Sequence, residues 1–134
     1  MKILFVCKGN VARSQMAEAY YNYFTKSNNA ISAGVLDFTP LKYGHPVEVV
    51  IQAMKEDGID VSQKTVKFIS KEMVEGADRI FIMCQEEECP DFLLNSQKIT
   101  FWNIDDPYNM SLENHRKIRN KVKRHVIRLI KKLK

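Results

Sequence analysis

The 134-residue sequence lacks several features that would place it in other classes of protein. No window approaches the roughly 20 consecutive apolar residues that a membrane-spanning helix requires. The apolar run at the N-terminus covers only about five residues, which predicts no secretory signal. There are no internal repeats and no low-complexity tracts. We therefore expect one domain over residues 1–134, located in the cytoplasm and without membrane contact.

Cysteine and histidine are also scarce, with three residues of each type. An odd number of cysteines in a chain without a signal favours a reducing compartment and reactive thiols over a disulfide framework. No group of Cys and His residues has the spacing of zinc ligands. We therefore expect no metal, and we expect no cofactor.

Acidic residues are absent from the last part of the chain. Residues 116–134 contain ten Lys and Arg, whereas the other 115 residues carry 11 Lys and Arg against 16 Asp and Glu. Apolar residues recur at helical spacing within this basic segment, which predicts an amphipathic helix docked on the core with its lysines in solvent. A basic face can also attract an acidic substrate, an acidic redox partner or nucleic acid; we expect no nucleic-acid partner.

Apolar segments alternate with amphipathic ones along the chain. The expected strands are 2–6, 30–33, 79–83 and 99–102; the expected helices are 13–25, 46–57, 71–75 and one from about 111, with a loop containing Pro40 and Gly44 and a short segment at 66–68. The strand 79–83 is apolar without alternation, which is typical of a parallel sheet covered on both faces. The predicted fold class is α/β: a three-layer sandwich with a central parallel four-stranded sheet and helices on both faces.

The most informative motif follows the first expected strand, in the sequence CKGNVARS at residues 7–14. It places Cys7 at the end of a buried strand and Arg13 where a helix begins. The N–H groups between them can surround a tetrahedral oxyanion, to which the helix N-terminus adds positive charge. The guanidinium can bind two oxygens, and Cys7 is expected to be largely thiolate. The candidate oxyanion-binding residues are Lys8, Gly9, Asn10, Val11, Ala12, Arg13 and Ser14.

Simpler interpretations exist for parts of this motif. A cysteine that ends an apolar strand is often a small buried hydrophobe, and Asn10 and Ser14 are typical of a turn and a helix N-cap. Strand, glycine-containing loop and helix in this order favour the oxyanion site.

Asp106, followed by Pro107, is the second candidate for chemistry. Its carboxyl group could protonate a leaving alkoxide or phenoxide and later accept a proton from water. Taken alone, Asp-Pro is an ordinary turn before a helix. With the Cys7 loop upstream, we interpret Asp106 as the general acid.

These motifs resemble the low-molecular-weight protein tyrosine phosphatase superfamily, which includes the thioredoxin-coupled arsenate reductases. The resemblance is carried by residues 7–18, Ser32-Ala33-Gly34, Ala53-Met54, Gly58-Ile59-Asp60, Cys84, Cys89-Pro90, Trp102 and Asp105-Asp106-Pro107. It implies the fold predicted above, with Cys7 as nucleophile and Asp106 as acid. It also implies that Asn10 holds the loop in a strained shape and that Ser14 steadies the thiolate.

Cys84 and Cys89 favour the reductase branch of this superfamily. In the arsenate reductases, a second cysteine at the end of this strand attacks the arsenic adduct of the nucleophile, and a third cysteine, before a proline, closes a disulfide that thioredoxin reduces. The resemblance thus implies arsenate reduction through Cys7, Cys84 and Cys89, with thioredoxin or a similar dithiol as partner. The alternative is a tyrosine phosphatase that hydrolyses phosphotyrosine through a cysteinyl-phosphate, with the other two cysteines as bystanders. We expect a monomer in either case.

The chain departs from the reductases that it resembles at several positions. The spacer between Cys84 and Cys89 is shorter; in a straight helix they would lie about 7.5 Å apart along the axis, so a disulfide needs a non-helical segment. Lys67 stands where many reductases have an acid that helps to bind a monovalent cation, and its ammonium group could replace that cation. Lys8 could add charge at the mouth of the loop or point to water. Tyr108 is more typical of the phosphatases.

Overall fold

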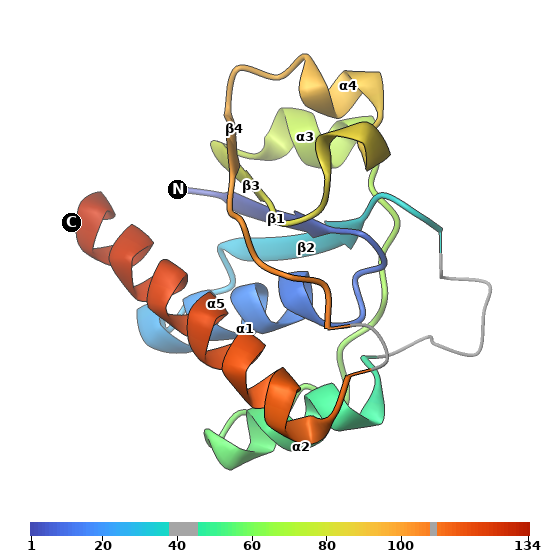
Figure 1. Cartoon of the computed structure of the whole chain (residues 1–134). Helices are drawn as coiled ribbons and strands as arrows, with labels where there is room; N and C mark the ends of the chain where they lie inside the picture. The colour runs from blue at the N-terminus through green and yellow to red at the C-terminus, as the bar shows by residue number, and fades with distance from the viewer. Residues whose placement is uncertain (38–45, 108–109) are drawn as a thin grey trace.

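A parallel sheet lies between two layers of helices in the computed structural model (Figure 1). The structure describes residues 1–37, 46–107 and 110–134, so the expected loop with Pro40 and Gly44, as well as Tyr108, lies outside the described residues. The strands are β1 (Ile3–Cys7), β2 (Ala30–Gly34), β3 (Arg79–Ile82) and β4 (Ile99–Phe101), in the order β2-β1-β3-β4 with every pair parallel. This arrangement confirms the predicted fold class.

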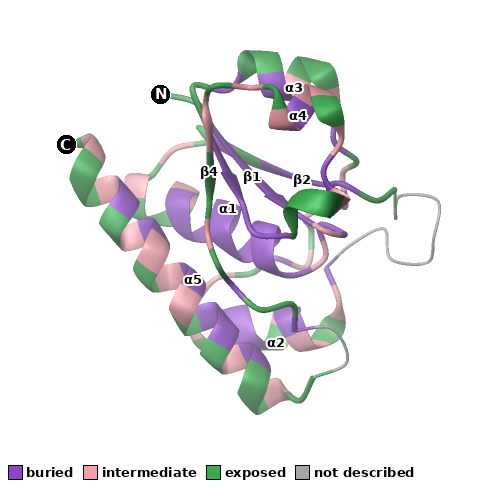
Figure 2. Ribbon diagram, turned by 45° about the horizontal axis from the view of Figure 1, so that its top comes forward, coloured by how far each residue is buried: buried purple, intermediate pink, exposed green. Residues whose placement is uncertain are grey.

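The two faces of the sheet bury separate apolar cores. The helices are α1 (Arg13–Thr25), α2 (Glu48–Glu56), α3 (Lys71–Gly76), α4 (Asp91–Leu94) and α5 (Leu112–Leu133), with a 3₁₀ turn η1 (Glu86–Glu88). Ile3 and Phe5 of β1 pack with α1, α2 and α5, whereas Leu4 and Val6 pack with α3 and α4. Alternate residues of a strand point to opposite faces, so a fully buried strand feeds both cores (Figure 2).

The strand register places the ends of three strands level with one another. Cys7 is paired with Gly34 at the end of β2, and Val6 is paired with Ile82 at the end of β3. In open parallel sheets ligands bind beyond the carboxyl ends of the strands. The loops that leave β1, β2 and β3 therefore meet at one edge of the sheet.

Several expected elements differ from the observed ones in their bounds. The second helix begins at Glu48 rather than 46, and Gly58 follows its end with a left-handed φ of 78°. The segment 66–68 contributes only an isolated bridge between Phe68 and Gly34. The turn η1 and helix α4 were not expected, because single turns are too short to show helical periodicity. Among the described helices, none combines the length and apolar character needed to cross a membrane.

Candidate active site

Cys7 ends β1 at the centre of the sheet edge, where it is almost completely buried. Its Sγ lies 2.9 Å from the Ser14 hydroxyl oxygen and accepts the Asn10 N–H at 3.3 Å. The loop therefore folds back over the sulfur, and both contacts can stabilise a thiolate. These are the neighbours that the sequence predicted for a nucleophilic cysteine.

Helix α1 begins directly after this loop. Its N-cap residue is Ala12, and no side chain accepts a hydrogen bond at that cap. Ser14 lies inside the helix and bonds to Cys7 and Asn10, so the interpretation of Ser14 as a helix cap is wrong. The first N–H groups of a helix carry its partial positive charge. With the cap position left to alanine, those donors are available to an oxyanion.

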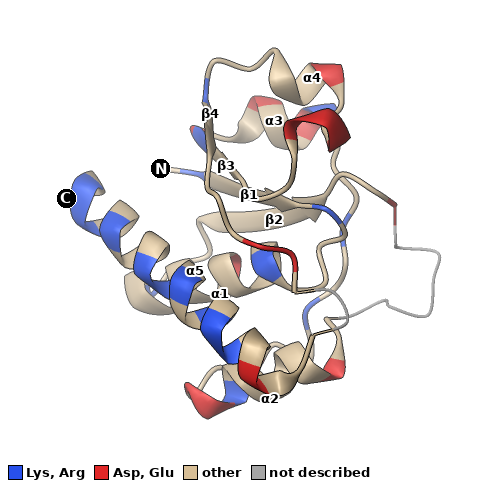
Figure 3. Cartoon of the chain, viewed as in Figure 1, with Lys and Arg blue, Asp and Glu red and all other residues tan. Residues whose placement is uncertain are grey.

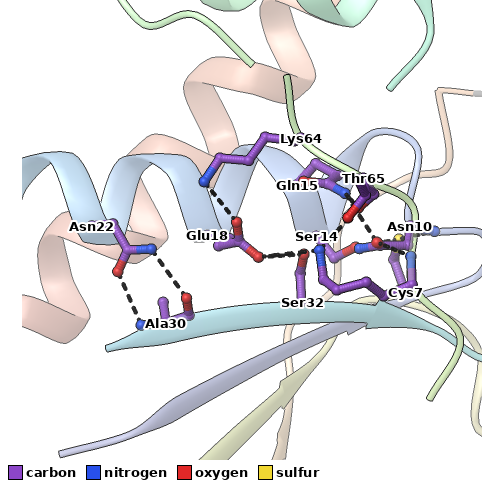
Figure 4. A network of polar contacts seen from close by, with 11 residues as sticks. Cys7, Asn10, Ser14, Gln15, Glu18, Asn22, Ala30, Ser32, Lys64 and Thr65 are labelled. Atoms are coloured by element: carbon purple, nitrogen blue, oxygen red, sulfur yellow. Dashed lines mark hydrogen bonds and ion pairs between the residues drawn. The ribbon is translucent and has the colours of Figure 1, made fainter. Parts of the chain in front are cut away.

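Asn10 holds the loop in a conformation that few residues adopt. Its φ is 60°, a left-handed value that costs free energy for a residue other than glycine. The completely buried side chain offsets this cost: Nδ2 donates to the Ser14 Oγ at 2.7 Å, and Oδ1 accepts from the Gln15 side chain at 3.0 Å and from the Lys67 N–H at 2.9 Å. Asn10 thereby connects the loop, α1 and the segment before α3 (Figure 4).

Gly34 supports the same loop from β2, a role that our sequence reasoning did not identify. A Cβ at this position would lie 2.7 Å from the carbonyl carbon of Gly9 and 2.9 Å from the backbone nitrogen of Asn10. The Cβ would meet backbone atoms, which cannot move aside as the end of a flexible side chain could. The available signal was a glycine at a strand end, where the chain permits close backbone approach.

Arg13 connects the loops that follow three strands. Its guanidinium is only 5% exposed; Nη1 donates to the carbonyl oxygens of Met83 and, at 3.0 Å, Ile104. Nη2 lies 3.8 Å from Oδ2 of Asp106, whose side chain is 44% exposed. The structure thus places Arg13 beside Asp106, and Ser14, the residue after Arg13, contacts Cys7. The guanidinium is also bound to Met83, which directly precedes Cys84.

Cys84 and Cys89 lie beside each other as free thiols. Their Sγ atoms are 3.8 Å apart, and both residues are buried. Between them lies a single 3₁₀ turn with an extended residue on each side, so the segment meets the predicted condition of not being a regular α-helix. Neither cysteine is an exposed thiol.

Burial raises the pKa of the Cys84 thiol strongly, and the neighbouring sulfur of Cys89 and the charge of Cys7 raise it further. Burial also raises the pKa of Cys89, partly offset by the hydrogen bond from Cys84, and the nearby glutamates raise it again. A thiol with a raised pKa is mainly protonated at neutral pH, which lowers its reactivity. Both Cys84 and Cys89 are therefore expected to be mainly thiols at neutral pH.

Two lysines lie beside the buried carboxylate of Glu18, and Figure 4 shows one of them, Lys64, directed toward it. Lys64 Nζ lies 3.0 Å from Oε2, Lys67 Nζ lies 3.6 Å from Oε1, and the Ser32 hydroxyl donates to Oε1 at 2.8 Å. Lys67 also donates to the Thr65 carbonyl at 3.0 Å. Desolvation lowers the pKa of Lys67, while Glu18 acts in the opposite direction. The resemblance pointed to Lys67 here, whereas Lys64, three residues earlier in the same segment, was not identified.

The remaining positions of the predicted loop have different surroundings. The Lys8 side chain forms an ion pair: its Nζ lies 3.5 Å from the Glu88 carboxylate. It therefore differs from both expectations, a charge at the mouth of the loop and a side chain in water. Val11 is partly exposed, and Ala12 and Gly9 are buried. In the described parts of the chain, no group of three or more His, Cys, Asp or Glu residues is placed to hold a metal ion.

Comparisons with known proteins agree with this geometry. The chain is 31% identical to an arsenate reductase of Staphylococcus aureus (strain Newman) over 125 residues, which cover 90% of this chain and 89% of the relative. A low molecular weight protein tyrosine phosphatase from T. tengcongensis superposes with a TM-score of 0.84 at 28% identity, covering 98% of this chain and 99% of the other. An arsenate reductase in its phosphate-binding state gives a TM-score of 0.83 at 30% identity, with both chains completely covered.

The match to a family extends over almost the whole sequence. Residues 2–134 match the low molecular weight phosphotyrosine protein phosphatase family. The matched region includes the Cys7 loop, Arg13, both later cysteines and Asp106. The chain belongs to the low molecular weight phosphotyrosine protein phosphatase family and is an enzyme with a cysteine nucleophile.

Proposed function

We propose that this protein reduces arsenate to arsenite, with Cys7 as nucleophile and Cys84 and Cys89 as the redox pair. The observation that carries the proposal is the 3.8 Å separation of the two sulfur atoms, in a turn adjoining the Cys7 loop. A hydrolase needs one thiol, whereas a two-electron reduction needs a pair that can end as a disulfide. The similarity to arsenate reductases over 90% of the chain supports this assignment.

The first half of the reaction occurs in the oxyanion loop. The thiolate of Cys7 attacks arsenic and forms an As–S bond, while one As–O bond breaks and the oxygen leaves as water with a proton from Asp106. Arg13 and the loop N–H groups bind the remaining oxygens. Arg13 is already held by Met83 and Ile104, so little conformational freedom is lost when substrate binds.

The second half transfers two electrons from the thiols. Cys84 attacks the sulfur of Cys7, an S–S bond forms, and the electron pair of the As–S bond stays on arsenic, which becomes trivalent and leaves as arsenite. Cys89 then attacks Cys84 and releases Cys7 as thiolate, so the reaction ends in a Cys84–Cys89 disulfide. We expect thioredoxin or a similar dithiol to restore both thiols, and we expect the enzyme to act as a monomer.

A phosphatase that uses the same first half is the second candidate. Leu36 favours it: this residue is exposed, and its N–H donates to the carbonyl of Lys8, so an apolar surface lies beside the oxyanion loop. An aryl group on a phosphate ester could contact such a surface. Phosphate-ester cleavage would use Cys7, Arg13 and Asp106 through a cysteinyl-phosphate and leave the other thiols unchanged.

A single turnover of fully reduced protein with arsenate tests the assignment. We expect one arsenite per protein and one Cys84–Cys89 disulfide, identified by peptide mass mapping after alkylation. Cys84→Ser and Cys89→Ser should each stop turnover with a dithiol reductant. If all three thiols stay free while an aryl phosphate is hydrolysed, the protein is a phosphatase and the reductase proposal is wrong.

A further inference from the structure

Glu88 contacts residues adjacent to two of the three cysteines and is itself adjacent to the third. Its Oε1 accepts the N–H of Gln85, which follows Cys84, at 2.9 Å, and its Oε2 lies 3.5 Å from Nζ of Lys8, which follows Cys7. Glu88 itself directly precedes Cys89. One carboxylate therefore lies where the oxyanion loop and the turn with the redox pair meet.

The contact with Gln85 closes the turn between Cys84 and Cys89. Gln85 and Glu88 form a reciprocal capping box, in which each side chain accepts a hydrogen bond from the backbone of the other residue. The N–H of Cys89 also donates to the Glu86 carbonyl at 3.0 Å. A capping box fixes the start of a turn by pairing donors that would otherwise face water. Here it directs Cys89 back toward Cys84.

The contact with Lys8 joins this turn to the oxyanion loop. Both side chains are partly exposed, at 44% and 28%, so the ion pair adds little to the stability of the fold. Its consequence is positional: within the described residues, it is the ion pair that links the oxyanion loop to the turn between the two thiols.

We infer that Glu88 is a positioning residue for the last thiol exchange, holding Cys89 against Cys84 and fixing the turn relative to Cys7. The inference rests on the proposed function. In that exchange, the thiolate of Cys89 attacks Cys84 and forms a new S–S bond. The bond between Cys84 and Cys7 breaks, its electron pair leaves on Cys7 as thiolate, and the proton of Cys89 passes to solvent.

The charge of Glu88 and its positioning contacts should have opposite effects on the rate of thiol exchange. The carboxylate raises the pKa of both Cys84 and Cys89, after the larger effect of burial. A purely electrostatic role therefore predicts faster thiol exchange when the charge is removed. A positioning role predicts slower exchange and a less stable disulfide. The two explanations differ in sign.

Three variants separate the contacts of Glu88. Glu88→Gln keeps a carbonyl oxygen for the Gln85 N–H but loses the attraction to Lys8, and Glu88→Ala loses both contacts. Glu87→Gln is the matched control, because Glu87 lies in the same turn and also raises the pKa of Cys89. Glu87 makes no side-chain hydrogen bond or ion pair with any residue that the structure describes. Thermal unfolding of each full-length variant checks that it is folded.

The first experiment needs no arsenate. Each protein is equilibrated at neutral pH with mixtures of reduced and oxidised dithiothreitol, and the Cys84–Cys89 disulfide is quantified by alkylation and peptide mass mapping. We expect Glu88→Ala to disfavour the disulfide about tenfold, Glu88→Gln to lie between it and wild type, and Glu87→Gln to stay within about twofold. Equal values for Glu88→Ala and Glu87→Gln would overturn the inference.

The second experiment uses a single turnover with arsenate and follows both disulfides over time. We expect the Cys7–Cys84 disulfide to accumulate in Glu88→Ala. In wild type and Glu87→Gln we expect Cys89 to convert it to the Cys84–Cys89 disulfide. If wild type consumes no thiol, the proposed function is wrong. The dithiothreitol equilibrium alone then tests whether Glu88 holds Cys89 against Cys84. If wild type reacts and Glu88→Ala resolves the first disulfide as fast as Glu87→Gln, Glu88 has no positioning role.

Discussion

The loop after β1 and the turn after β3 end at the same edge of the sheet but are held in different ways. In the loop, the buried side chain of Asn10 bonds to the side chains of Ser14 and Gln15 in α1 and to the backbone N–H of Lys67. In the turn, short-range contacts between Gln85 and Glu88 close a single exposed turn, whose acidic surface contrasts with the basic face of α5 (Figure 3). Oxyanion binding gains from groups fixed in advance, whereas thiol exchange requires sulfur atoms to move between partners. The proposed mechanism thus assigns oxyanion binding to the region with more buried hydrogen bonds and thiol exchange to the region with fewer.

The largest expected effect separates the chemistry of the two regions. Cys7→Ser should lower both arsenate reduction and aryl phosphate cleavage by about a thousandfold or more, because it removes the nucleophile that both reactions share. Cys84→Ser should stop only arsenate reduction. Initial rates with both substrates provide the measurement. Substantial arsenate reduction by Cys84→Ser would show that this reaction does not need the thiols of the turn. The loop and the turn would then not have the separate roles proposed here.

Asn10→Ala tests the rigidity of the loop. Removing this side chain leaves the buried groups of Gln15 and Lys67 without their partner, so we expect kcat/KM to fall about a hundredfold and the free energy of unfolding to fall by about 2–3 kcal/mol. The control is Asn22→Ala. Asn22 exchanges two hydrogen bonds with the backbone of Ala30, away from the site. It should destabilise the protein yet leave kcat/KM nearly unchanged; equal activity losses in the two variants would mean that only stability matters.

Gly34→Ala should have a smaller effect on the same loop. The new methyl group would meet backbone atoms of Gly9 and Asn10 at 3.0 Å or less, so the loop must shift, and we expect about a tenfold loss of kcat/KM with a destabilisation of about 1–3 kcal/mol. Gly76→Ala, where a Cβ meets open space, is the matched control and should be neutral or slightly stabilising. Unchanged activity of Gly34→Ala would show that the loop tolerates movement.

The sequence predicted the loop after β1 better than the turn after β3. The apolar run before it placed Cys7 at the end of a strand, with Arg13 at the start of the next helix. Asp106 was expected near them from the resemblance, and its Oδ2 lies 3.8 Å from Nη2 of Arg13. Asn10 was also expected to hold the loop, and the structure gives the partners through which it does so. The position of Cys7 was predicted from the apolar strand before it, whereas the roles of Asn10 and Asp106 were expected from the resemblance of the motifs.

The distance between Cys84 and Cys89 could not be predicted in the same way. It depends on the dihedral angles of a single turn, and the side chain that closes this turn is one of three consecutive glutamates with no distinguishing sequence signal. The contact of Lys64 with Glu18 was missed for a related reason: it joins two segments far apart in the sequence, and lysines in polar loops are usually solvated.

The smallest expected effect concerns the charge of the turn. Glu86 and Glu87 are exposed and raise the pKa of Cys89 after the larger effect of burial. Because burial raises the pKa of Cys89 above its ordinary value, the thiolate fraction of Cys89 should still increase with pH between pH 7 and 9. Glu86→Gln should lower this pKa slightly and increase the alkylation rate by about twofold, since exposed charges are screened by solvent and salt. The measurement is the rate of iodoacetamide labelling of Cys89 in a Cys7→Ser background, with Glu75→Gln on α3 as the control. If the labelling rate does not change with pH, opening of the turn rather than ionisation of Cys89 limits labelling. The turn would then be held more tightly than its few contacts suggest.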